Sequence, residues 1–158
     1  MNLQDAWRYH QWATERTLES CEKLSFEELT KDLGGSFPSL RETLVHCLFA
    51  DGVWFHRVQG LAYTKPKPED FSSVSDLKAA WQPLFTSWIG LIDQTDPEKV
   101  LQYSALDGQP FKSSFEEIVR HVVNHGSYHR GQVAMMLRLL GHAPIQTDWI
   151  VMTRSARQ

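Results

Sequence analysis

Apolar residues recur every three or four positions along most of the chain. That spacing places apolar side chains on one face of a helix. In the clearest example, which ends before Gly141, the stripe advances by steps of four, three, four, four, three and four residues. Its members are Ile118, Val122, His125, His129, Val133, Met136 and Leu140. The pattern predicts a long core-facing helix that carries two histidines at core positions.

The same spacing predicts two long helices in the first part of the chain. One is expected from about Leu3 to Cys21. The other is expected to begin after Ser39 and to end near Gly60. Ser39 and Glu42 have the spacing of a capping box, in which the two side chains satisfy free backbone N–H groups at the start of a helix.

Two more long helices are expected further along. The third is predicted to begin after Ser75 and to run to about Gln94. Pro83 lies inside it and should kink or split it, because proline lacks an N–H and its ring crowds the preceding turn. The fourth is the striped helix, and Ser114 with Glu117 forms a capping box at its start.

The segments between these helices contain turn-forming residues. Residues 26–39 read as a connector broken by two glycines, and residues 62–71 as a surface loop with two prolines. Asp107-Gly108 between short apolar runs predicts a hairpin, and Pro110 confines its second arm to an edge. A short last helix is expected near the sequence TDWIVMTRS.

These elements predict an all-α fold, a four-helix bundle with a small β-hairpin before the last long helix, in a single domain over residues 1–158. The chain is 42% hydrophobic and 22% charged, which is typical of globular proteins. A net charge of −3 without a basic tract argues against nucleic-acid binding. We expect a cytoplasmic protein with no membrane partner, because no signal-like or membrane-length apolar run occurs and Cys21 and Cys47 form no CxxC.

Three histidines, His121, His125 and His129, recur at intervals of four on the last long helix. Buried imidazoles need partners, so the core positions of His125 and His129 indicate either a metal site or structural hydrogen bonds. His121 and His129 begin about 12 Å apart along the helix, whereas metal–nitrogen bonds are about 2 Å long. One ion can therefore take only an adjacent pair from this helix.

A third ligand must then come from another part of the chain. The other histidines are His10, His46, His56 and His142. His46 lies well inside the second helix, His56 near that helix's end and His142 in a loop. Spacing favours His46 only modestly, and His10 remains an alternative.

Four segments of the chain resemble the DinB family (DinB/YfiT-like proteins). YHQWA is similar to the family's Tyr-x-x-Trp-Ala signature near the start, and LRETLVHCLFADGVW to its second-helix segment. LDGQPF is similar to the hairpin before the last long helix. HVVNHGSYHRGQV is similar to the most specific segment, in which HxxxH is followed by Arg-Gly-Gln.

The resemblance implies a bundle that binds a divalent metal ion through three histidines. Carried over to this chain, the ligands are His46, His125 and His129, and the ion is Zn, Ni, Mn or Fe. His121 matches a position that is often histidine but is not a ligand. Of the tryptophans, Trp54 could line the pocket and Trp149 could cover its mouth.

Several polar residues near these histidines allow two interpretations. Asp51 either orients a ligand histidine or is a solvated or capping carboxylate. Arg130 and Gln132 either support the site or substrate, or lie on the helix surface, the default for an arginine. Cys47 is expected to be a buried thiol, because it diverges from His46 by about 100° around the helix.

The resemblance also implies a class of reaction. Relatives include metal-dependent transferases that use low-molecular-weight thiols, so we expect a thiol S-transferase with a small-molecule substrate. A metal-dependent hydrolase and a non-catalytic metal- or ligand-binding protein are the alternatives, and a homodimer is allowed. The sequence contains no HExxH protease motif, phosphate-binding loop or GxSxG motif.

Overall fold

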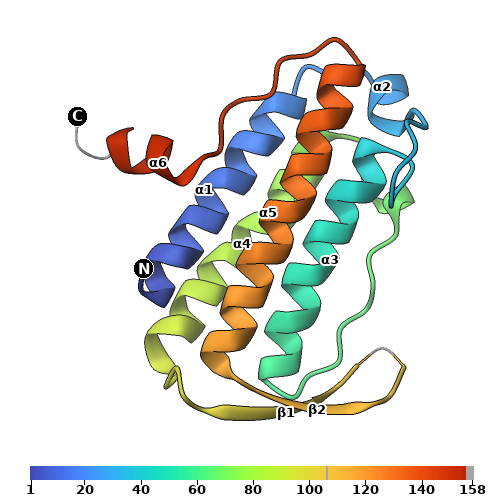
Figure 1. Ribbon diagram of the computed structural model, residues 1–158. Coiled ribbons are helices and arrows are strands. Elements are labelled where there is room, and N and C mark those ends of the chain that lie inside the picture. The colour runs from blue at the N-terminus through green and yellow to red at the C-terminus, as the bar shows by residue number, and fades with distance from the viewer. Residues whose placement is uncertain (106, 156–158) are drawn as a thin grey trace.

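Four long helices pack side by side in the computed structural model, which describes residues 1–105 and 107–155. They are α1 (Leu3–Cys21), α3 (Leu40–Val58), α4 (Val74–Gln94) and α5 (Phe115–Leu139). Figure 1 shows α5 in front, between α1 and α3, with α4 behind. The predicted all-α bundle is therefore confirmed.

Side-chain caps start each long helix. Ser39 accepts a hydrogen bond from the Glu42 N–H at the start of α3, and Ser114 with Glu117 forms the expected capping box at α5. The predicted cap of α4 was wrong. Ser73, rather than Ser75, caps that helix, because Asp76 lies three residues after Ser73 and completes the box.

The break predicted at Pro83 was wrong, whereas the helix end predicted at Gly141 is confirmed. Pro83 does not split α4, which is continuous from Val74 to Gln94. Pro83 is exposed, so water can bond the carbonyl that its ring leaves unpaired. Gly141 follows the last turn of α5 with φ +84°, a conformation that glycine adopts without strain. It ends the helix as expected.

The predicted hairpin is present between α4 and α5. Strand β1 (Val100–Ser104) pairs antiparallel with β2 (Pro110–Ser114). The last pair is Ser104 with Pro110, and the described residues of the connection are Ala105 and residues 107–109. Gly108 lies in that connection with φ +85°. The hairpin lies across the end of the bundle where α3 ends and α5 begins (Figure 1).

Short helices lie in the remaining segments. The connector over residues 26–39 contains the helix α2 (Phe26–Thr30), which was not predicted although Ser25 and Glu28 form a capping box at its start. The loop after α3 contains the single turn η1 (Pro68–Asp70). The last helix, α6 (Trp149–Ser155), lies where the sequence predicted it.

Large aromatic side chains fill the bundle core. The most deeply buried of them are Trp7, Trp81, Phe85, Trp88 and Phe115. The two cysteines are also buried as free thiols, and burial raises the pKa of Cys21 to about 12 and that of Cys47 still further. Cys47 is thus the inert buried thiol that was expected. Among the described residues, no helix is long and apolar enough to cross a bilayer.

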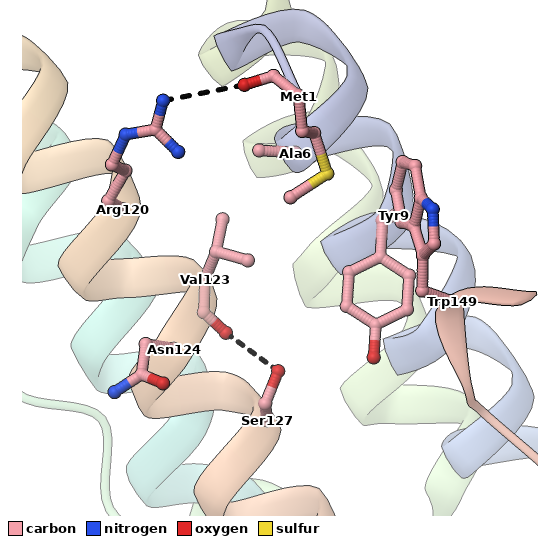
Figure 2. Close-up of a pocket in the computed structure, with 8 residues that line it drawn as sticks. All are labelled: Met1, Ala6, Tyr9, Arg120, Val123, Asn124, Ser127 and Trp149. Carbon is pink, nitrogen blue, oxygen red and sulfur yellow. Dashed lines mark hydrogen bonds between the residues drawn. The ribbon is translucent and has the colours of Figure 1, made fainter.

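A hollow of about 300 Å³ lies between α1, α5 and α6. Its wall includes Tyr9, Val123 and Trp149, which Figure 2 shows around the opening between the helices. The Trp149 ring packs edge-on against Tyr9, with 5.3 Å between ring centres. Helix α6 therefore packs against α1 on the outside of the four-helix bundle.

Candidate metal centre

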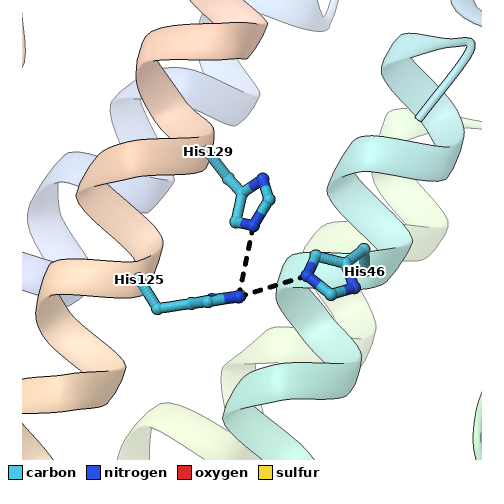
Figure 3. Close-up of side chains that lie close together, drawn as sticks. All are labelled: His46, His125 and His129. Carbon is cyan, nitrogen blue, oxygen red and sulfur yellow. Dashed lines mark hydrogen bonds between the residues drawn. The ribbon is translucent and has the colours of Figure 1, made fainter. Parts of the chain in front are cut away.

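The side chains of His46, His125 and His129 meet between α3 and α5. Figure 3 shows the three rings pointing toward one another, with His46 on α3 and the other two on successive turns of α5. The Nε2 atom of His125 lies 3.1 Å from Nε2 of His46 and 3.2 Å from Nε2 of His129. One potential ligand atom from each residue lies within 4.8 Å of the others.

This geometry fits a small divalent ion. Metal–nitrogen bonds of about 2.0–2.1 Å, at angles between octahedral and tetrahedral, separate the nitrogens by about 2.8–3.4 Å. The two separations at His125 lie in that range. The remaining pair, His46 and His129, has its ligand atoms within 4.8 Å of each other. The three convergent nitrogens could hold one divalent ion.

Gln132 determines which nitrogen of His129 faces this centre. Its Oε1 lies 2.7 Å from Nδ1 of His129, and its Nε2 donates to Ser36 Oγ at 3.3 Å. Because an amide oxygen only accepts, Nδ1 of His129 carries the proton and Nε2 presents a lone pair to the centre. Gln132 therefore supports the site, the first of its two expected roles.

An aromatic ring and the bundle itself cover part of the centre. Phe37, from the loop before α3, stacks on His46 with 4.2 Å between ring centres. His129 is buried, whereas His46 and His125 are half-buried. The centre is thus shielded by the bundle and reached from solvent past the half-buried rings.

Burial lowers the pKa of His46 and of His125 to about 4. Neighbouring charge adds to this effect, from His129 and Lys65 at His46 and from the other histidines at His125. Both rings are therefore neutral at physiological pH, which is the form that binds a metal.

The structure does not bring His56 or His142 to the centre. Nδ1 of His56 bonds the Gly52 carbonyl one turn earlier on α3, at 2.8 Å. Nε2 of His142 pairs with Glu28 of α2 at 2.9 Å. Both have local partners of their own.

His121 lies next to the centre but outside it. Its ring centre is 5.9 Å from that of His125 and 5.2 Å from that of Trp54. Trp54, on α3, therefore contacts the first of the three histidines on α5. Trp149, by contrast, packs on Tyr9 and does not cover this site.

A second buried polar cluster connects α1, α3, α4 and α5. Oδ2 of Asp51 accepts from Nε2 of His10 and from Nε1 of Trp81, each at 2.9 Å. Arg130 donates through Nη1 to Nδ1 of His10 at 3.2 Å and through Nη2 to Ser127 Oγ at 2.8 Å. Because a guanidinium only donates, the His10 proton is on Nε2 and is directed at Asp51.

This cluster corrects the interpretations of three residues. His10 is 2% exposed and hydrogen-bonded at both nitrogens, so it does not join the trio of His46, His125 and His129. Asp51 is 2% exposed, neither solvated nor bonded to one of the trio. Arg130 is 6% exposed rather than on the helix surface, and burial lowers its pKa. The buried carboxylate and guanidinium balance each other's charge through the His10 ring.

Gly126 makes this arrangement possible. A Cβ atom there would lie 2.4 Å from Cε1 of His10 and 2.8 Å from Nη1 of Arg130. Glycine is thus required on this turn of α5, between His125 and His129, so that α1 can approach closely.

The family assignment agrees with this architecture. The sequence pattern of the DinB family matches this chain over residues 1–158. The chain belongs to the DinB family. Its relatives in this family include protein DinB of Bacillus subtilis, which is 26% identical over 152 residues, covering 90% of this chain and 88% of the relative. The uncharacterized protein YizA of Bacillus subtilis is 24% identical over 134 residues, covering 82% of each chain.

A solved structure shows the same DinB fold. The crystal structure of a DinB-like protein from Bacillus cereus superposes with a TM-score of 0.68 at 17% identity. The match covers 91% of this chain and 94% of that one. At this level of identity the likeness concerns the fold alone.

Two contacts of the DinB site were not anticipated from the sequence. Phe37 and Ser36 reach it from the glycine-containing connector, in which no periodic pattern points toward the bundle. The Gln132 contact had a signal, because residues three positions apart on a helix are neighbours and Gln132 follows His129 by three.

Proposed function

We propose that His46, His125 and His129 bind a divalent metal ion and that the protein is a metal-dependent transferase of low-molecular-weight thiols. The observation that carries the proposal is the convergence of three Nε2 atoms, two pairs of which are 3.1 and 3.2 Å apart. Imidazole ligands suit zinc, nickel and iron.

The ligand set favours an open centre. Structural zinc sites are usually closed by four protein ligands, whereas catalytic sites keep a position for water or substrate. Among residues 1–105 and 107–155, the candidate metal group has three members and includes no carboxylate or thiol. Because the three imidazoles are neutral, an ion held there would keep its full positive charge and would lower the pKa of a bound thiol, so that its sulfur would be nucleophilic near neutral pH.

The surrounding residues favour a thiol over water as the nucleophile. Asp51, the buried carboxylate of α3, accepts hydrogen bonds from His10 and Trp81 and is unavailable as a base. A general base beside the ion would assist attack by water, whereas a thiol ionises readily once its pKa is lowered. In the proposed reaction the thiol loses its proton to solvent and its sulfur bonds an electrophilic carbon. The leaving group departs with its bonding electrons.

Metal content tests the first half of the proposal. Each of His46, His125 and His129 is replaced by alanine, and bound Zn, Ni, Mn and Fe are measured after loading and dialysis. We expect each variant to lose the metal. His121→Ala and His56→Ala are the controls, and both should retain it because their rings lie outside the trio. Full occupancy in His46→Ala, or loss in His121→Ala, would show that the ligand set is different.

Thiol chemistry tests the second half. In cobalt-loaded protein, at least one physiological thiol should produce a sulfur-to-metal charge-transfer band that is absent in His125→Ala. The same thiol should displace chloride from monochlorobimane faster with the metal-loaded protein than with the metal-free protein. A band without turnover over a broad electrophile panel would favour the non-catalytic alternative, and metal-dependent ester cleavage without a band would favour the hydrolase.

A further inference from the structure

An aromatic hollow lies beside the proposed metal centre, between the end of α3 and the hairpin. Its volume is about 550 Å³, and its walls include Trp54, Arg57, Tyr103 and Phe111. Trp54 meets Tyr103 edge-on with 4.9 Å between ring centres, and Tyr103 stacks on Phe111 at 6.1 Å. We call these four residues the aromatic hollow.

The aromatic hollow has the size and surface of a small-molecule site. Such sites have volumes of about 300–1,000 Å³, with apolar walls and a few polar groups that fix orientation. Here Phe111 is 46% exposed, a large ring left open to solvent. Stacked and edge-on rings favour a planar aromatic guest, because ring pairs gain more than the burial of area alone.

Arg57 adds a requirement for negative charge. Its guanidinium carbon lies 4.9 Å from the centre of the Trp54 ring, in cation–π contact. Within the described part of the chain, Arg57 has no ion-pair partner, although it is half-buried. Asp107 also lines the hollow, and its side chain accepts a hydrogen bond from the N–H of Gln109 in its own turn. A guanidinium in contact with a ring face keeps N–H groups that can bind a carboxylate.

Ring contacts connect the aromatic hollow to the histidines of α5. Trp54 contacts His121, and His121 contacts His125, in ring-to-ring steps of 5.2 and 5.9 Å. Along α3, Trp54 lies about 12 Å beyond His46, and Arg57 lies one further turn away. A long guest held at Arg57 and Trp54 and extended along α3 past His121 would reach the trio.

We propose that the aromatic hollow binds the aromatic carboxylate portion of the electrophilic substrate. Arg57 holds the carboxylate, Trp54 and Phe111 hold the ring, and the reactive end extends past His121. This inference rests on the proposed function only in naming the guest as substrate, because binding in the aromatic hollow requires neither metal nor thiol.

Binding to metal-free protein tests the site separately from the proposed function. Naphthoate and its neutral analogue naphthylmethanol are compared by equilibrium dialysis. We expect naphthoate to bind at least tenfold more tightly, Arg57→Gln to remove that preference, and Phe111→Ala to weaken both ligands. Arg120→Gln, which alters the arginine of the hollow between α1 and α5, is the matched control and should change neither affinity. Equal binding of the two ligands, or an unchanged preference in Arg57→Gln, overturns the inference.

Cobalt-loaded protein tests the position of the guest. The ring protons of bound naphthoate should be broadened or shifted by the paramagnetic ion, and the effect should disappear in His125→Ala although naphthoate still binds. Tight binding with no paramagnetic effect in protein shown to contain cobalt would place the guest away from the metal and overturn its role as substrate. Failure of cobalt to bind at all would contradict the proposed metal site, while the dialysis result would stand.

Discussion

Gly126 offers a sharp test of how the bundle is packed around the histidines. Replacing it with alanine adds one methyl group on the inner side of α5. That methyl carbon would lie 2.4 Å from Cε1 of His10, whereas ordinary contacts begin at 3.4 Å. Gly131, five residues later on the same helix, has nothing within 4 Å of an added Cβ. The pair Gly126→Ala and Gly131→Ala therefore isolates the contact with His10 from the helix preference of alanine.

The sizes of the two effects follow from these distances. Alanine in place of glycine inside a helix stabilises by about 0.5–1 kcal/mol, and Gly131→Ala should show that gain alone. At Gly126 the His10 ring would have to move by about 1 Å, yet it is bonded to Asp51 and to Arg130 at its two nitrogens. Overpacking of this kind costs about 1–3 kcal/mol, and each hydrogen bond lost adds about 1 kcal/mol. Gly126→Ala should thus be destabilised by about 1–3 kcal/mol overall.

Urea unfolding of the metal-free variants provides the measurement. We expect the midpoint of Gly131→Ala above that of the parent protein and the midpoint of Gly126→Ala below it, with similar slopes. The free energies of unfolding of the two variants should differ by about 2–4 kcal/mol. If Gly126→Ala is as stable as Gly131→Ala, α1 does not approach α5 as closely as described, and the hydrogen bonds assigned to His10 are wrong.

Two further predictions concern the stability of the metal-free protein, one for the buried Asp51 and one for its dependence on pH. Asp51→Ala should lower the free energy of unfolding by about 3–5 kcal/mol, because it leaves Arg130 without a balancing charge, and Asp51→Asn should cost less since it keeps an acceptor. A loss below about 1 kcal/mol in urea unfolding of Asp51→Ala would contradict this. Metal-free protein should lose stability as the pH falls from about 6.5 to 4, because the unfolded chain binds protons there that His46 and His125, with pKa values of about 4, do not. The double variant His46→Gln/His125→Gln should show a shallower dependence of its urea midpoint on pH, and an equal slope would refute the assignment.

Much of the bundle was predictable because helix signals are local. The stripe on α5 and the caps at Ser39 and Ser114 depend on residues three or four positions apart, and each helix lies where they indicated. The cap of α4 was misplaced because serines occupy positions 72, 73 and 75, and only Ser73 has a carboxylate three residues later.

The candidate site was predictable only in part. The i, i+4 pair His125 and His129 is visible in the sequence, but four other histidines could have joined it by spacing alone. The resemblance to the DinB family singled out His46, which the structure brings to the pair. The burial of Arg130 had no local signal, because it depends on α1 approaching α5 at a glycine.

The placement of the trio has a consequence for the lifetime of the folded chain. His46 and His125 are 79 positions apart, and the segment between them contains α4 and the hairpin. An ion joining α3 to α5 would act as a reversible cross-link that closes half the chain into a ring. By the measure used for a covalent bridge, closing a loop of that length raises the free energy of the unfolded chain by about 4.5 kcal/mol. Resistance to proteases would then rise and fall with the free concentration of the metal.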